Sequence, residues 1–464
     1  MLLNPLLLNK GARIAVIGAG ISGIAAANVL KKNGFEAVVF EKAENPGGVW
    51  AVAYPDIHLQ NTYASYHLSD FPWSFKPDLH PSGAQIMRYW QEAIKHLRLD
   101  VRLGHEVLAL EEQSDGWLLR YKNQKGNYEE TFKYVIIAVG QYTEGKYRPP
   151  FPGEEQFNGT IITERDVRSL DIFNDKRVAV VGFGKSALDM STFAARRSKE
   201  VHHIFRTPRW TIPEWILGVH FTHILFSRFG TVMMTSWAHP TPAERFLHGP
   251  LKAGINKFWD LIASVFKGQI ERLGKNKDQA AKERLNAVIP KHKFLPDLRS
   301  AGALAPESYY PLVADGKIQP HQAEVSGFTR NGIQLQNGCE IPCDLAVLSL
   351  GSKTPVFPFL PEKYRQLCSK ANPMARSSIV ISFIRIFRVL ALQVSTMASC
   401  ISPLWKLVRS GCALMCAARS NCRPSPKWNA ASNTSARGSA PTSNSSRHVR
   451  SLSARVFSNI LIFC

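Results

Sequence analysis

Two short glycine-rich stretches are the parts of this 464-residue chain whose residue types and spacing are best suited to binding chemistry. In the first stretch, Gly18, Gly20 and Gly23 follow the apolar run 13–17. Gly18 allows a tight turn, Gly20 lets the backbone approach a pyrophosphate at a helix N-terminus, and Gly23 lets helix and strand pack closely. A strand, a glycine turn and a small-residue helix in this order predict a dinucleotide-binding unit.

The second stretch repeats this pattern about 160 residues later. Gly182, Gly184 and Ala187 follow the apolar run 177–181, with Ala187 at the third small position. The same physical argument predicts a second strand, turn and helix that could hold a second dinucleotide.

The two units differ in the side chain that follows the next strand. Glu41 stands 23 residues after Gly18, whereas Arg206 stands 24 residues after Gly182. A carboxylate accepts hydrogen bonds from a free ribose diol, while a guanidinium offers a planar fork to a 2′-phosphate. The contrast predicts FAD in the first unit and NADPH in the second, with Arg209 as a further cation. The alternative for either arginine is a solvated surface charge.

These units predict an α/β fold with two nested Rossmann-like dinucleotide-binding domains, the FAD domain being interrupted by the NADPH domain. The Pro-rich crossing 148–153 marks entry to the inserted domain. We expect the following division: 1–145, first part of the FAD domain; 146–335, NADPH domain with an insert; 336–366, return to the FAD domain through a strand at 344–351; 367–464, a basic tail.

The sequence predicts helices in two further segments. Residues 82–98 show helical periodicity after a Ser82 cap. Residues 215–226 are too interrupted by polar side chains to span a membrane, and we expect a buried helix; a helix that lines a substrate entrance or rests on a membrane surface is the alternative.

The net charge of +21 is concentrated at the end of the chain. The 102 residues after Glu362 contain 15 of the 57 Lys and Arg and none of the 36 Asp and Glu, so the body is only mildly basic and no nucleic-acid partner is expected. Six of the eight cysteines also lie in this tail. A body with only Cys339 and Cys343 suits a reducing compartment, and we expect a cytoplasmic protein with peripheral membrane contact as an option.

Three interpretations of the tail compete. Residues 419–455 have the composition of a basic arm for nucleic acid, and 379–394 could form a basic membrane-surface helix. The favoured interpretation is a frameshifted translation. Residues 391–403 can be encoded by codons that, in another reading frame, give a sequence of glycines and aromatic residues typical of a strand, a turn and a helix. A frameshift would remove part of the cofactor and substrate pocket and could leave this chain inactive or unstable.

The spacing of Glu41, Gly47, Gly48 and Trp50 resembles the FAD-binding region of the flavin-containing monooxygenases and their Baeyer-Villiger relatives. The segment 69–72 (SDFP) strengthens the resemblance to the first group. The resemblance covers residues 12 to about 362, and the out-of-frame tail text is similar to the family segment that closes the FAD site.

The resemblance implies that NADPH reduces FAD and that O2 then forms a flavin hydroperoxide. This species would oxygenate an amine nitrogen or thioether sulfur of a small molecule, as in an N,N-dimethylaniline monooxygenase. By spacing, the amide near the reactive edge of the flavin is Gln60, with Asn61 beside it; an ordinary loop amide is the alternative. These two residues are the catalytic candidates.

The linker that begins at Phe157 departs from the family pattern FxGxxxHxxx(Y/W). Thr163 stands at the histidine and Val167 at the aromatic position, which argues against a Baeyer-Villiger enzyme. A disulfide-reductase-like enzyme would need a redox Cys-x-x-Cys, and Cys339 and Cys343 have the wrong spacing. A non-catalytic nucleotide-binding pseudoenzyme, created by the tail, is the alternative outside enzymes.

The remaining candidates are side chains and turns beside these motifs. No metal site is expected because the histidines lack ligand spacing, and the expected partners are a small-molecule substrate and O2, with the oligomeric state open. The cofactor-binding candidates are Gly18, Gly20, Ser22, Gly23, Glu41, Lys42, Gly48, Trp50 and Val107 for FAD, and Gly182, Gly184, Lys185, Ser186, Arg206 and Arg209 for NADPH.

Overall fold

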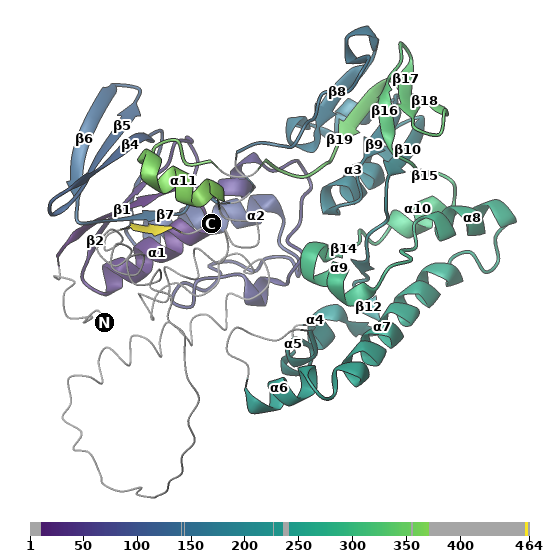
Figure 1. Cartoon of the computed structure of the whole chain (residues 1–464), viewed down its shortest axis with the longest axis horizontal. Helices are drawn as coiled ribbons and strands as arrows, with labels where there is room; N and C mark the ends of the chain where they lie inside the picture. Colours follow the sequence, from purple (N-terminus) through teal and green to yellow (C-terminus); the bar gives the residue numbers. More distant parts are fainter. Residues whose placement is uncertain are drawn as a thin grey trace, which may run out of the picture.

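The computed structural model describes residues 11–140, 142, 144–225, 227–234, 241–353, 356–370 and 460–462. Figure 1 shows the first parallel sheet with helix α1 on the left, the second parallel sheet at the upper right, and a helical insert below it. Almost all of the acid-free tail, including the segments on which its three interpretations rest, lies outside the described residues.

The first sheet holds the first glycine-rich stretch. It has the strand order β20-β7-β1-β2-β3, and all its neighbours are parallel. The apolar, β-branched runs of its central strands are buried on both faces, as a parallel sheet requires. Its strands are β1 (Arg13–Ile17), β2 (Glu36–Phe40), β3 (Asp100–Arg102), β7 (Tyr134–Ile137) and β20 (Ile460–Ile462).

Two helices and an antiparallel sheet complete this region. Helix α1 (Ile21–Lys32) links β1 to β2, and α2 (Gly83–His96) begins at Ser82, which forms a capping box with Gln85 and confirms the helix predicted there. The antiparallel sheet packs its apolar face on the first sheet through Trp117, Leu119 and Phe132. Its strands are β4 (Glu106–Gln113), β5 (Gly116–Asn123) and β6 (Gly126–Phe132).

The second sheet holds the second glycine-rich stretch and has the strand order β15-β10-β9-β19-β8 with parallel neighbours. Helices α3, α8 and α10 pack on it, and a small antiparallel sheet covers the other side. The elements are β8 (Thr160–Thr163), β9 (Arg177–Val181), α3 (Lys185–Ala195), β10 (Glu200–Phe205), α8 (Gln279–Ala287), α10 (Tyr309–Ala314), β15 (Gln319–Gln322), β16 (Val325–Phe328), β17 (Gly332–Leu335), β18 (Glu340–Pro342) and β19 (Leu345–Leu348).

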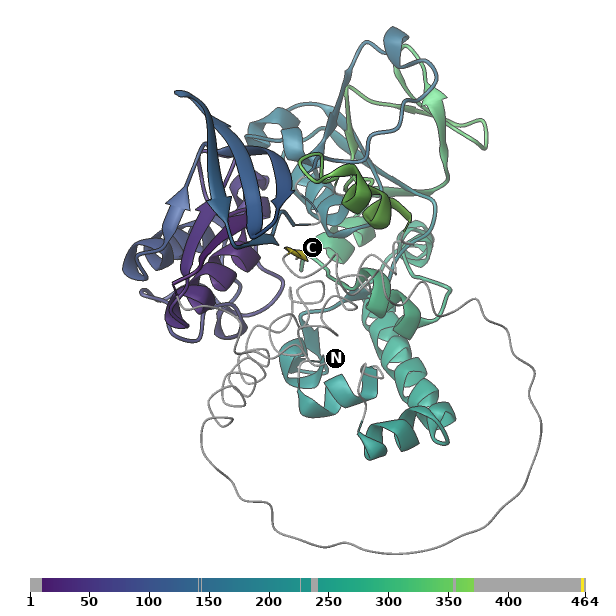
Figure 2. The ribbon, with the colours of Figure 1, turned by 60° about the vertical axis from the view of Figure 1, so that its left-hand side comes forward.

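The insert is a helical layer between β10 and α8 that extends away from both sheets in the two views (Figures 1 and 2). Trp210, Trp259, Phe266 and Phe294 form its core. Its elements are β11 (Thr211–Ile212), β12 (Trp215–Ile216), β13 (Val219–His220), α4 (Phe221–Leu225), α5 (Arg228–Met234), α6 (Pro242–His248) and α7 (Lys252–Arg272), to which α9 (Phe294–Ala301) and β14 (Ala303–Leu304) add later in the chain.

The helix predicted over 215–226 is wrong for its first half. Strands β12 and β13 form an antiparallel hairpin, and only α4 is helical. Leu217 (φ 50°) and Gly218 (φ 82°) both adopt left-handed backbone, which is the geometry of a two-residue hairpin turn. Among the helices of the described ranges, none combines the length and apolar character that a membrane span needs.

The strand predicted at 344–351 as a return to the FAD domain lies in the second sheet instead. β19 pairs with β9 and β8, and the Asp344 carboxylate accepts hydrogen bonds from the Arg177 backbone and guanidinium. The return comes later: Phe359 and Leu360 pack in the core of the first region, and helix α11 (Glu362–Lys370) follows them. The fold class is confirmed as mixed α/β with two parallel dinucleotide-type sheets.

Candidate functional site

The first glycine turn leaves no room for side chains at two positions. Gly18 has φ 106°, and a Cβ there would lie 2.4 Å from the carbonyl oxygen of Ala138. A Cβ on Gly23 would lie 1.9 Å from the carbonyl oxygen of Gly18. Glycine is therefore needed at both positions for β1, the turn and α1 to pack as closely as they do.

The N-terminus of α1 is built for an anion. Its N-cap is Gly20, no side chain caps the first backbone N–H groups, and the first turn has no acidic residue. Gly48 approaches so closely that a Cβ on it would lie 3.1 Å from the Gly20 Cα. The uncapped N–H groups, the positive end of the helix dipole and the absence of side chains at Gly20 and Gly48 make this helix N-terminus suitable for a diphosphate.

Glu41 organises the turn from the end of β2. Its two carboxylate oxygens accept hydrogen bonds from the backbone N–H groups of Ala19 (2.8 Å) and Ala43 (2.9 Å). Each oxygen keeps a second lone pair that a ribose hydroxyl could use. Beside it, Lys42 is exposed and Ser22 half-buried in the first turn of α1.

Other predicted residues of the first unit lie further out. The Trp50 indole donates a hydrogen bond to the Tyr66 hydroxyl (2.8 Å), which fixes the aromatic ring beside the Gly47–Gly48 turn. Val107 is buried in the apolar core against Ala15 and Ile17, so its side chain serves packing.

Gln60 and Asn61 lie on a loop that faces the insert. The Gln60 side-chain oxygen accepts a hydrogen bond from the Leu304 backbone N–H (2.8 Å), and Asn61 is buried. Gln60 therefore joins the loop to β14, which the loop-amide interpretation also allows.

The second glycine turn repeats the first with one difference. Gly182 has φ 124°, and a Cβ on it would lie 2.3 Å from the carbonyl oxygen of Ser349. Helix α3 begins at Gly184 without a side-chain cap and without an acid in its first turn, so it too offers free N–H groups to a phosphate. Ala187 is fully buried, and its methyl fits where the first unit has Gly23.

A buried histidine closes this second turn. His203 on β10 donates a hydrogen bond from Nε2 to the carbonyl of Gly182 (2.6 Å), because a carbonyl can only accept, and its Nδ1 accepts from the Tyr309 hydroxyl (2.7 Å). Burial lowers the pKa of His203 to about 4, so the ring is neutral.

A chain of polar contacts joins the two units. Lys185 pairs with Asp189 one helical turn later (2.5 Å), and the other oxygen of Asp189 accepts from the Tyr54 hydroxyl (2.7 Å). Burial raises the pKa of Tyr54 well above its ordinary value, so this hydroxyl keeps its proton. Ser186 is half-buried beside them. Tyr54 and Asp189 were missed in the sequence because 135 residues separate them.

The two predicted arginines have different surroundings. Arg206 follows β10 directly, has a side chain 76% exposed, and its nearest acid is Glu324 at 3.8 Å. Arg209 is tied by a 2.5 Å ion pair to Asp297, whose side chain is 1% exposed and also accepts from the Trp210 backbone N–H. The structure thus leaves Arg206 available to a phosphate and engages Arg209 in holding the insert together.

The two turns define a protein with paired dinucleotide-type folds, and comparison with known proteins gives its relatives. A sequence profile described as "Pyridine nucleotide-disulphide oxidoreductase" matches residues 15–220. The chain is 27% identical over 424 aligned positions to "Probable flavin-containing monooxygenase 1" of Arabidopsis thaliana, covering 79% of this chain and 76% of that protein. It is 29% identical to a 4-hydroxybenzoate brominase (decarboxylating) of Pseudoalteromonas luteoviolacea, covering 75% of this chain and 64% of the relative.

Solved structures with this fold include an oxidized steroid monooxygenase bound to NADP (TM-score 0.57, 19% identity, 74% of this chain and 72% of the other). Another is OTEMO in complex with FAD and NADP (TM-score 0.55, 21% identity, 75% of this chain and 72% of the other). The resemblance predicted from the sequence is confirmed: this chain is similar to flavin-containing monooxygenases over about three quarters of its length.

Proposed function

We propose that this protein is an FAD- and NADPH-dependent monooxygenase that oxygenates an amine nitrogen or a thioether sulfur of a small molecule, as an N,N-dimethylaniline monooxygenase does. The observation that carries the proposal is the contrast between Glu41, held at the first glycine turn by two backbone N–H groups, and the exposed Arg206 at the same place of the second unit.

In this proposal the flavin supplies hydride acceptance and oxygen activation, and the protein supplies binding and orientation. The free N–H groups of α1 and α3 hold the two diphosphates, Glu41 orients the FAD ribose, and Arg206 selects the 2′-phosphate of NADPH. Gln60 and Asn61 are proposed to face the flavin edge from the loop next to β14. The cytoplasmic location and the predicted boundary between the two domains near residue 145 are part of the same proposal, while the return to the FAD domain is placed near Phe359 and not at residue 336.

The linker after Phe157 favours heteroatom oxygenation over Baeyer-Villiger chemistry. Thr163 donates hydrogen bonds from its backbone N–H and its hydroxyl to Asp166, and Val167 is fully buried. Both positions therefore serve local structure and lack the histidine and aromatic groups of the ketone-oxygenating pattern.

The cysteines disfavour the reductase alternative. Cys339 is exposed and Cys343 is buried, at the two ends of β18, and both are free thiols. Burial raises the pKa of the Cys343 thiol to about 12, so it does not supply the thiolate that disulfide exchange needs.

Purified protein tests the proposal. We expect bound FAD that NADPH bleaches faster than NADH does, that air restores, and that supports substrate-dependent O2 uptake with a dimethylaniline or a thioether. A cyclic ketone as the better substrate would move the assignment to Baeyer-Villiger chemistry. A chain that binds no flavin even when FAD is added would overturn the enzymatic assignment and leave the pseudoenzyme.

A further inference from the structure

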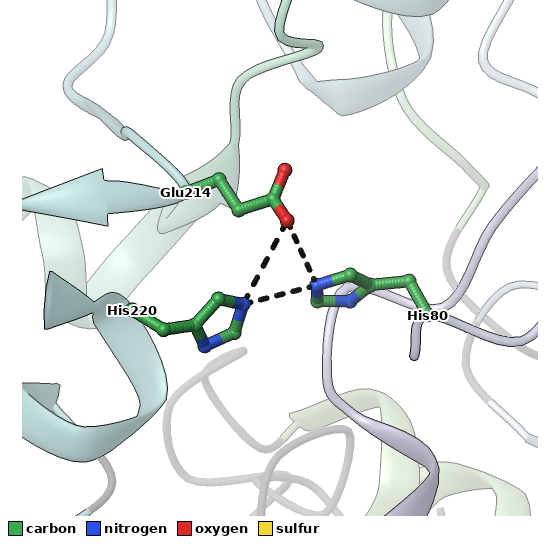
Figure 3. A group of neighbouring side chains, drawn as sticks. All are labelled: His80, Glu214 and His220. Carbon is green, nitrogen blue, oxygen red and sulfur yellow. Dashed lines mark hydrogen bonds and ion pairs between the residues drawn. The ribbon is translucent and has the colours of Figure 1, made fainter. Parts of the chain in front are cut away.

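Three side chains that the sequence keeps far apart meet between the loop of Gln60 and the insert (Figure 3). His80 lies on the loop before α2, Glu214 precedes β12, and His220 ends the β12–β13 hairpin. The Nε2 atoms of the two histidines are 3.4 Å apart, and a Glu214 carboxylate oxygen lies 3.7 Å from His80 Nε2 and 3.8 Å from His220 Nε2.

These separations are longer than ordinary hydrogen bonds but suit a shared metal ion. Hydrogen bonds between nitrogen and oxygen span about 2.7–3.2 Å. Ligand atoms that bind tetrahedral zinc at about 2.0–2.1 Å lie roughly 3.3–3.4 Å from one another. The triangle formed by His80, Glu214 and His220 is only slightly wider, so a small side-chain adjustment would bring all three atoms onto one ion.

The Nδ1 atoms of both histidines have hydrogen-bond partners. Nδ1 of His80 lies 3.1 Å from the carbonyl oxygens of both Leu59 and Asn61, and carbonyls accept only, so this nitrogen carries the hydrogen. Nδ1 of His220 lies 2.7 Å from the Thr222 hydroxyl, which can accept in the same way. Outer partners of this kind orient metal-binding histidines and leave Nε2 with its lone pair.

A positive charge between these three groups would stabilise their contact. Two Nε2 lone pairs and a carboxylate that face one another repel unless a proton or a cation is shared. A proton on one Nε2 atom would be shared over separations of 3.4–3.8 Å, which are longer than ordinary hydrogen bonds. A divalent ion satisfies all three.

The surroundings protect the cluster. The side chain of His220 is 7% exposed and that of His80 is 15% exposed. The Phe221 ring stacks on His80 and the Trp215 ring packs edge-on against His220, which limits access by water to the ligand atoms.

We propose that His80, Glu214 and His220 form a zinc-binding site that fastens the β12–β13 hairpin to the loop bearing Gln60 and Asn61. Two histidines and a carboxylate supply three ligands, and water or a substrate group supplies the fourth. Because His80 also holds the carbonyls on both sides of Gln60, the ion would immobilise that loop. The proposal does not depend on the cofactor assignment.

The test is zinc binding by the full-length protein after treatment with a chelator. We expect one Zn²⁺ per chain at micromolar concentration by calorimetry and metal analysis, and a visible absorption band of tetrahedral Co²⁺ when cobalt replaces zinc. His80→Ala and Glu214→Gln should each weaken zinc binding by at least roughly a hundredfold, since even outer partners are worth tenfold to a hundredfold. Glu214→Gln preserves the shape of the side chain in case the histidine variant folds poorly.

The matched control is His58→Ala. His58 is an exposed histidine on the same loop, and its Nδ1 also faces a backbone carbonyl, that of Asp56 (3.0 Å), outside the cluster. This variant should bind zinc like the wild type, and zinc should raise the melting temperature of both while slowing hydrogen exchange at residues 59–61 and 215–220. Binding that needs millimolar zinc, or that persists unchanged in His80→Ala and Glu214→Gln, would overturn the proposal.

Discussion

The two glycine turns have the same backbone shape, but different side chains stabilise them. In the first unit Gly23 packs directly on the carbonyl of Gly18, and a carboxylate, Glu41, holds the turn from the end of the next strand. In the second unit Ala187 takes the place of that glycine, and the neutral His203 donates to the Gly182 carbonyl. The comparison teaches that the backbone shape is shared while the side chains that stabilise it, and the charge offered to the ligand, are specific to each unit.

Gly23→Ala should have the largest effect and should show most clearly how the two units differ. A Cβ 1.9 Å from the Gly18 carbonyl oxygen forces β1 and α1 apart, and we expect the free energy of unfolding to fall by about 3 kcal/mol with loss of bound flavin. Urea unfolding and the flavin-to-protein ratio measure this. The matched change Ala187→Gly should cost only about 1 kcal/mol. Equal costs at the two positions would contradict the difference between the units.

The next largest effect concerns Glu41. In Glu41→Gln one oxygen is replaced by an amide group that cannot accept from a backbone N–H, so FAD affinity should fall by about 2 kcal/mol, or roughly thirtyfold. Flavin fluorescence titration of the apoprotein measures the affinity. Glu44→Gln, an exposed carboxylate on the same loop, is the control and should bind FAD normally. Unchanged affinity in Glu41→Gln would show that this carboxylate serves only the protein.

Substitution of the two arginines of the second unit should have different effects. Arg206→Gln removes a charge-assisted contact of about 1.5 kcal/mol, so KM for NADPH should rise about tenfold while KM for NADH stays the same. Steady-state kinetics with both coenzymes measure the ratio. Arg209→Gln should leave that ratio unchanged and instead lower stability, because it removes the guanidinium that pairs with the buried Asp297 carboxylate. A changed coenzyme ratio in Arg209→Gln would reverse the two roles.

The smallest effect is a pH dependence that comes from His203 of the second unit. The pKa of His203 is lowered from its ordinary 6.5 to about 4 by burial, so unfolding takes up a proton between these values. Stability from this group is complete above pH 6.5 and falls as the pH drops towards 4, by about 1 kcal/mol between pH 7 and 5.5. His203→Gln keeps a donor for the Gly182 carbonyl without titrating.

Urea unfolding at the two pH values measures this difference. The variant should lose about 1 kcal/mol less than the wild type over that interval. The pKa of His321 is also lowered to about 4, first by burial and then by His202, but it titrates in both proteins and cancels in the comparison. Identical pH slopes would show that His203 is not the group responsible.

The local structure of both dinucleotide-type units could be predicted from residues that are close together in the sequence. The two strand–turn–helix units, the Ser82-capped helix and the contrast between Glu41 and Arg206 all follow from spacing within about 25 residues, because a βαβ unit is locally encoded. Gly18, Gly23 and Gly182 were predictable for the same reason: a left-handed φ or a close backbone approach leaves no room for a side chain at these positions.

Other features were decided by tertiary packing. Residues 215–220 form a hairpin where a helix was predicted, and its turn holds Leu217 in a left-handed conformation that this residue type does not favour. The strand at 345–348 joined the second sheet because it fits between β8 and β9, a preference that its apolar residues do not reveal.

The sequence by itself therefore determined two nucleotide-type turns and the opposite charges beside them. Only the tertiary structure decided that Arg209 belongs to Asp297, 88 residues away, and that His80 meets His220, 140 residues away. The physical reason is that hydrogen bonds and ion pairs between distant residues depend on how whole elements pack, and no local periodicity records that packing.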